Sequence, residues 1–160
     1  MSTDPALSGN RRRQMKSAAR LYAVQALFQM EHSQQSSTAV RDEFLEHRFG
    51  AEVDEGVDMA EGDVDLFCKL IDDAVNWQAK IDQMTDRALV AKWPIARIDP
   101  TLRALFRAAA AEMTQSDTPP RVVIMEFVDV AKAFYPEGKE SKFVNAVLDH
   151  MAHEAKPEAF

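Results

Sequence analysis

Basic side chains near the start of the chain are spaced in a way that could bind an anion such as phosphate. They are Arg11, Arg12, Arg13, Lys16 and Arg20. On a helix, Arg13, Lys16 and Arg20 share one face, because residues three and four apart are neighbours there. The same line continues into the apolar Val24 and Leu27. This pattern predicts a helix whose later turns pack in a core while its first turns present cations to a phosphate backbone.

A second group of candidate residues lies near the end of the chain. Lys139 and Lys142 could contact phosphate, Phe143 could stack on an unpaired base, and Asn145 could hydrogen-bond a base edge. Two of them have other interpretations. Phe143 lies beside the apolar stripe of Val147 and also suits a core position, while Asn145 could brace a neighbouring helix. This segment alone does not establish nucleic-acid binding.

The other polar residues form no catalytic or metal-binding pattern in the sequence. The chain has five glycines, and they build no phosphate-binding loop. Of its four histidines, only His150 and His153 are close enough to share a helix face. A metal site would need a larger converging set of ligands. We therefore predict a protein that is not an enzyme and that uses no cofactor or metal.

Composition limits the kind of interface that the chain can carry. Its 160 residues have a formal net charge of −7, with 46% hydrophobic and 28% charged residues. A negative chain is unsuited to binding nucleic acid over its whole surface, so such a site must be local. The acidity is concentrated in residues 50–62, which we interpret as a solvated connector rather than an interaction tail.

A single domain in a reducing cytoplasm is expected. Residues 1–13 offer little to bury and predict a disordered basic lead-in, whereas residues 14–155 can enclose one core. The lone Cys68 excludes an internal disulfide and suits a buried apolar position. The sequence contains no signal peptide and no apolar run of membrane-spanning length.

Apolar residues recur with helical spacing along the chain, and no segment alternates cleanly with period two. The expected helices cover residues 14–33, 36–49, 63–93 with a bend near Trp77, 99–113, 118–134 and 139–153. Asp63 and Asp99 are predicted as N-terminal caps, and one of Ser36, Ser37 and Thr38 as a third. The β-branched run 122–124 favours a strand, but the preceding prolines and the later helical spacing outweigh it. We predict an all-α bundle of six or seven helices.

Four stretches of the sequence resemble the NusB family of bacterial transcription antitermination factors. They are RLYAVQALF from Arg20, the segment from Arg103 to Glu112, the stretch from Pro119 to Lys132, and KFVNAVLD from Lys142. The resemblance implies two packed helical subdomains with a role in RNA binding. It further implies that boxA-type RNA of nascent transcripts, notably ribosomal RNA leaders, is bound together with the small-subunit ribosomal protein NusE. Other Nus factors would connect this assembly to RNA polymerase.

Residue roles follow from the resemblance position by position. RNA contacts are implied for Lys16, Arg20, Gln25, Phe28, Lys142, Phe143 and Asn145. The helix that opens at Asp99 is associated with the ribosomal-protein partner, which implicates Leu102, Arg103 and Phe106. A homodimer is a further expectation. The chain departs from the family in having Lys16-Ser17 where an arginine pair is usual, and Leu102 where an acidic residue is usual.

The basic face from Arg11 to Arg20 has an alternative interpretation. It could contact an acidic protein, which would make the chain a protein-only helical adaptor without RNA recognition. An enzyme acting on RNA is a third class, and the sequence offers no catalytic constellation for it.

Overall fold

The computed structural model describes residues 9–49, 62–92 and 98–160. Within these ranges the chain forms seven α-helices: α1 (Gly9–Ser33), α2 (Ser37–Phe44), α3 (Val64–Asn76), α4 (Gln78–Lys92), α5 (Pro100–Gln115), α6 (Pro120–Phe134) and α7 (Lys139–Ala155). A π-helical turn, η1 (Leu45–Phe49), extends α2, and a 3-10 turn, η2 (Pro157–Ala159), follows α7. The prediction of an all-α bundle is confirmed. None of these helices is both long and apolar enough to cross a membrane.

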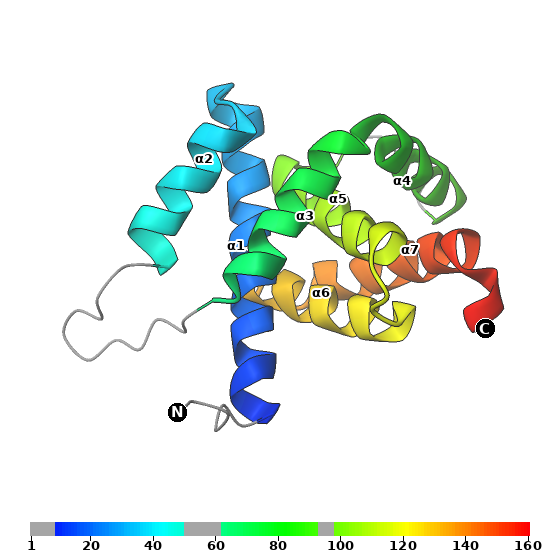
Figure 1. The fold of residues 1–160 in the computed structure, drawn as a ribbon. Coiled ribbons are helices and arrows are strands. Elements are labelled where there is room, and N and C mark those ends of the chain that lie inside the picture. Colours follow the sequence, from blue (N-terminus) through cyan, green and yellow to red (C-terminus); the bar gives the residue numbers. More distant parts are fainter. Residues whose placement is uncertain (1–8, 50–61, 93–97) are drawn as a thin grey trace.

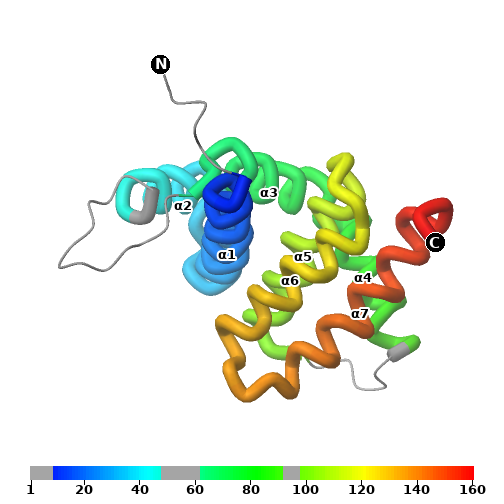
Figure 2. Tube along the Cα trace, turned by 90° about the horizontal axis from the view of Figure 1, so that it is seen from below, coloured from blue at the N-terminus to red at the C-terminus, as the bar shows by residue number. Residues whose placement is uncertain are grey.

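Helix α1 lies between two packed groups of helices, and each group has its own core (Figures 1 and 2). The small core joins α1 to α2 and α3 through side chains such as Tyr22, Phe44 and Phe67. The large core joins the other side of α1 to α4, α5, α6 and α7, with Leu27 and Phe106 among its members. One helix thus contributes to both cores. The expectation of two packed helical subdomains is confirmed.

The predicted caps begin the helices to which they were assigned. Ser36 Oγ accepts a hydrogen bond from Ala39 N at 3.1 Å. Asp63 Oδ1 accepts from Leu66 N, and Asp99 Oδ1 from Leu102 N, each at 3.0 Å. Each cap satisfies one of the backbone N–H groups that lack a partner in the first turn of a helix.

Helix α1 begins at Gly9 rather than near residue 14, which corrects the predicted extent of the lead-in. Arginine is a good helix former, so Arg11, Arg12 and Arg13 continue the helix instead of preceding it. Residues 1–8 of the predicted lead-in and residues 50–61 of the predicted acidic connector lie outside the described residues.

The bend predicted near Trp77 is confirmed, because this residue forms the turn between α3 and α4. Its backbone N–H still donates to Asp73 O at 3.0 Å, and its carbonyl accepts from Ile81 N at 2.9 Å. The chain therefore changes direction between the two helices without leaving these backbone groups unpaired.

Candidate nucleic-acid interface

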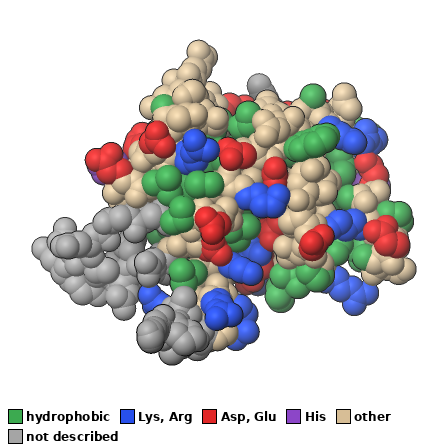
Figure 3. All heavy atoms as spheres, in the orientation of Figure 1, with side chains coloured by type: hydrophobic (Ala, Val, Ile, Leu, Met, Phe, Trp, Pro, Cys, Tyr) green, Lys and Arg blue, Asp and Glu red, His purple; other side chains and the backbone are tan. Residues whose placement is uncertain are grey.

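The start of α1 carries the predicted cationic cluster. Arg11, Arg12, Arg13 and Lys16 are all exposed, and the first turn of the helix contains no acidic residue. In Figure 3, Lys and Arg side chains border the lower end of α1, next to the grey residues. The partial positive charge of a helix N-terminus adds to these cations. This end of α1 is suited to an anionic chain such as a phosphate backbone.

One side of this basic end faces carboxylates at the start of α3. Arg12 and Lys16 line a hollow of about 410 Å³ together with Asp63 and Asp65. The backbone holds the two helices in register there, since Asp63 N donates to Met15 O at 3.0 Å. The carboxylates weaken the positive potential on that side, so the cluster is locally less cationic than its sequence suggests.

Arg20 does not belong to this exposed surface, and its predicted role in binding phosphate does not fit the structure. Its side chain is buried, and Nε and Nη2 donate to the two carboxylate oxygens of Glu112 at 2.7 Å each. Nη1 donates to Glu126 Oε1 at 2.8 Å. Burial alone would lower the pKa of the guanidinium, but the hydrogen bonds and charges of Glu112 and Glu126 outweigh it and raise the pKa. Arg20 ties α1 to α5 and α6.

Gln25 and Phe28 lie further along α1, beside a shallow hollow of about 420 Å³. Phe28 stacks on His32, with ring centroids 4.1 Å apart and an interplanar angle of 17°. Gln25 Oε1 is buried and has no hydrogen-bond partner among the described residues. His32 is not among the predicted RNA-contacting residues, although its position four residues after Phe28 places the two rings on one face of the helix.

The start of α7 presents the second predicted group. Gly138 adopts a left-handed conformation with φ of 85°, which favours glycine, and its carbonyl accepts from Ser141 Oγ at 2.7 Å. After this turn, Lys139, Lys142 and Asn145 are exposed.

Phe143 lies partly in the large core and partly at the surface. Its ring meets that of Phe106 edge to face, with centroids 6.1 Å apart and an interplanar angle of 70°. The two interpretations of Phe143 are therefore compatible. One part of the ring is fixed by packing, and the remainder lies at the surface.

The predicted protein-contact residues of α5 are mostly in the core, which corrects their assignment to a partner surface. Leu102 is 6% exposed and Phe106 is fully buried, so neither presents its side chain to a partner. Helix α5 is buried on most sides because small alanines allow its neighbours to approach closely. Of the three predicted residues, Arg103 is the one that is partly exposed and could contact another protein directly.

The two cationic groups have the chemistry of a phosphate-binding surface with an adjoining aromatic ring. Their members supply ammonium and guanidinium donors, an amide and a ring edge, but no nucleophile with an activating base. No group of three or more potential metal ligands gathers within the described ranges. The arrangement is suited to binding an unpaired nucleic-acid strand.

Comparison with known proteins gives concordant matches along the chain. The sequence model described as the NusB family matches residues 17–153. The transcription antitermination protein NusB of Caulobacter vibrioides is 48% identical over 151 residues, covering 94% of this chain and 99% of that protein. The protein of the same name from Granulibacter bethesdensis is 42% identical, with 94% and 95% covered. The solved structure of T. maritima NusB superposes with a TM-score of 0.67 at 29% identity, covering 94% of this chain and 96% of that one.

Proposed function

Since this chain belongs to the NusB family, we propose that it binds boxA-type single-stranded RNA of nascent transcripts together with the ribosomal protein NusE. The chain is a transcription antitermination factor by family membership, as its relatives are named. Its role is in transcription rather than in catalysis.

The observation that carries the RNA proposal is the placement of Phe143. Its ring is held against Phe106 in the large core, and Lys142 and Asn145 are exposed in the same turn of α7. A ring already ordered by packing loses little conformational freedom when a base contacts its exposed part, and an ammonium in the same helical turn can contact the phosphate of that nucleotide. Asn145 adds an amide that can hydrogen-bond a base edge.

Electrostatics supports a binding mode in which a protein partner contributes. This chain offers six exposed cations at the two groups: Arg11, Arg12, Arg13, Lys16, Lys139 and Lys142. The net charge of the whole chain is nevertheless −7, which repels RNA at long range. A basic partner such as a ribosomal protein would extend the positive surface and offset that repulsion. Arg103 is the predicted partner residue that could contact it, and other Nus factors would link the pair to RNA polymerase.

The first experiment is a binding titration of a fluorescent boxA-like RNA from a ribosomal leader, with and without the partner, across a salt series. A scrambled RNA of equal length serves as the sequence control. If six cations contact phosphate, log affinity should fall with log salt with a slope of about −4, because each contact on a single strand contributes about −0.7. Selective binding that requires both proteins supports the proposal.

Two variants test whether the α7 group supplies the contacts. Lys142→Ala should weaken binding to every RNA and reduce the salt slope by about one phosphate contact. Arg121→Ala is the matched control. Arg121 is an exposed cation in the first turn of α6, whereas the turn that leads into α7 follows the last residue of α6, about 20 Å away. Equal effects of the two variants would contradict a local site.

The alternative, a protein-only helical adaptor, predicts a different result from the same titration. It requires binding to the partner without any dependence on RNA, and Lys142→Ala would leave RNA affinity unchanged. Equal binding to the boxA-like and scrambled RNAs, or none with the partner present, would favour the adaptor.

A further inference from the structure

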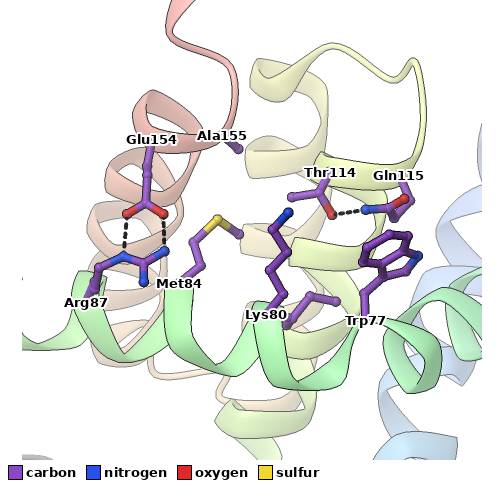
Figure 4. A pocket seen from close by; sticks show the side chains of 9 residues that line it. Trp77, Lys80, Met84, Arg87, Thr114, Gln115, Glu154 and Ala155 are labelled. Carbon is purple, nitrogen blue, oxygen red and sulfur yellow. Dashed lines mark hydrogen bonds and ion pairs between the residues drawn. The ribbon is translucent and has the colours of Figure 1, made fainter.

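A groove at the other end of the bundle has the size of a small-molecule site. It lies between α4 and the C-terminal ends of α5 and α7, and we name it the Trp77 groove (Figure 4). Its walls include Trp77, Lys80, Met84, Arg87, Gln115 and Glu154. Its volume of about 340 Å³ lies within the usual range for clefts that hold small ligands.

Trp77 gives this groove an aromatic surface. Its side chain occupies the turn between α3 and α4 and is 43% exposed. In Figure 4 the indole lies at one end of the groove, beside Gln115 of α5. The next turn of α4 is anchored by Ile81, which is 2% exposed and belongs to the large core. The indole is therefore held on a rigid turn while much of its surface remains accessible for stacking.

Lys80 gives the groove an uncompensated positive charge. Its Nζ lies 5.8 Å from the centroid of the Trp77 ring, and within the described part of the chain it forms no ion pair. Arg87, at the opposite end of the groove, is different because its guanidinium donates to both carboxylate oxygens of Glu154 (Figure 4). Of the two cations in this groove, Lys80 is thus the one whose ammonium can bind an anion without breaking an existing ion pair.

Unpaired carbonyl groups at the C-terminus of α5 would repel an anion, because this end of a helix carries a partial negative charge. Two other lysines already hold these groups. Lys69 Nζ donates to Gln115 O at 3.0 Å, and Lys156 Nζ donates to Ser116 O at 2.8 Å. These two ammonium groups therefore offset the negative end of the α5 dipole beside the groove.

We propose that the Trp77 groove binds a nucleoside monophosphate unit, with the base stacked on the indole of Trp77 and the phosphate on the ammonium of Lys80. A base that enters over the ring displaces the flexible lysine stem, and the released ammonium then meets the phosphate attached to that base. Adjacent aromatic and cationic groups are the combination that binds single nucleotides in unpaired strands. An acidic peptide would use the ammonium but not the aromatic plane.

This site is separate from the RNA surface proposed at the start of α7. Glu154 and Lys139 lie at opposite ends of α7, about 22 Å apart along its axis. The nucleotide could be free, or it could be one unit of an RNA strand. The two sources share the same chemistry, and the experiment distinguishes them.

The test uses the full chain with Trp93→Phe, which leaves Trp77 as the single indole of a protein that has two tryptophans. Trp93 lies outside the described residues. Indole fluorescence is followed while adenosine 5′-monophosphate, adenosine, ribose 5-phosphate or a short single-stranded oligoadenylate is added. Lys80→Gln is the diagnostic variant, and Lys132→Gln is the matched control, because Lys132 is an exposed lysine in the last turn of α6 that belongs to neither proposed site. Thermal unfolding of each variant checks that the fold is retained.

The expected result is saturable quenching by the nucleotide, with a Kd raised about tenfold by Lys80→Gln and unchanged by Lys132→Gln. Adenosine and ribose 5-phosphate should each bind more weakly than the intact nucleotide. Saturation by the mononucleotide identifies a free nucleotide as ligand, whereas Lys80-dependent saturation by the oligoadenylate alone identifies an RNA segment. Absence of saturable quenching by either ligand, or equal effects of the two lysine variants, would overturn the proposal. Neither result would alter the test of boxA binding, which depends on Lys142.

Discussion

Arg20 and Glu112 form a two-point ion pair in the interior, although they are 92 residues apart in the sequence. Both guanidinium–carboxylate contacts measure 2.7 Å, and Glu112 is 1% exposed. Glu126, which also accepts from Ser17 Oγ at 2.7 Å, completes the set of partners. This network joins α1, which carries the first cationic group, to α5 and α6, against which α7 with the second group packs.

Arg20→Ala should lower the free energy of unfolding by about 3–5 kcal/mol, because it leaves the buried Glu112 carboxylate without its cation. Urea unfolding measures this change. Arg13→Ala removes an exposed arginine from the same helix and should change the stability by less than about 0.5 kcal/mol. A similarly small effect of Arg20→Ala would contradict the assignment of Arg20 to a buried structural network.

The different roles of Arg20 and Lys16 show what helical spacing can and cannot predict. Spacing correctly places the two residues on one face of α1, but it cannot identify the carboxylates that α5 and α6 bring to that face. The same holds for Leu102. Its position in the sequence suggests a partner surface, but packing places it in the core. Pairings between distant segments determine burial, and a local pattern does not contain them.

Helix boundaries depend more on local chemistry, so most of them could be predicted. Asp63 and Asp99 act as the expected caps because the capping bond forms within a single turn. The start of α1 differs from the prediction because polar composition indicates disorder, whereas the arginines there are good helix formers. The Trp77 groove had no local signal, since its walls come from three different helices.

Phe143→Leu should separate the packing role of this residue from its proposed RNA contact. Leucine keeps most of the apolar volume against Phe106, so the loss of stability should be about 1 kcal/mol. Loss of the ring should weaken RNA binding by about 1–3 kcal/mol, the usual contribution of base–aromatic stacking. Binding is measured by fluorescence titration in the presence of the partner.

Phe127→Leu is the control for this prediction, because Phe127 is fully buried in the large core and has no exposed ring surface. It should destabilise the protein without a direct effect on RNA affinity under conditions where both variants are folded. Equal losses of RNA affinity for the two variants would show that Phe143 acts through packing alone.

Asp99→Ala should be more destabilising than Asp63→Ala. Both carboxylates cap a helix through a 3.0 Å hydrogen bond from the third residue along, and loss of such a cap costs about 1 kcal/mol. Asp99 additionally accepts the hydroxyl proton of Tyr135, whose oxygen lies 2.8 and 2.7 Å from its two carboxylate oxygens. Asp99→Ala should therefore lower the free energy of unfolding by about 0.5–1.5 kcal/mol more than Asp63→Ala does, as measured by urea unfolding at neutral pH. Equal costs would mean that the tyrosine contact does not stabilise the fold.

The contact between Tyr135 and Asp99 should also make stability depend on pH in the alkaline range. Burial and then the Asp99 carboxylate raise the pKa of Tyr135 above its ordinary value of 10.0. A raised folded-state pKa means that the folded protein retains this proton when the unfolded chain has lost it. The contribution is therefore fully present below the unfolded pKa, and it is lost as pH rises through the folded pKa.

Tyr135→Phe isolates this effect, because phenylalanine keeps the ring and removes the titrating hydroxyl. The difference in unfolding free energy between the natural chain and the variant should be constant up to about pH 9 and should decrease above about pH 10. Subtracting the variant removes the titration of lysines, which both chains share. A difference that stays constant, or that increases with pH, would contradict a neutral Tyr135 hydroxyl donating to Asp99, since only the protonated phenol can serve as the donor.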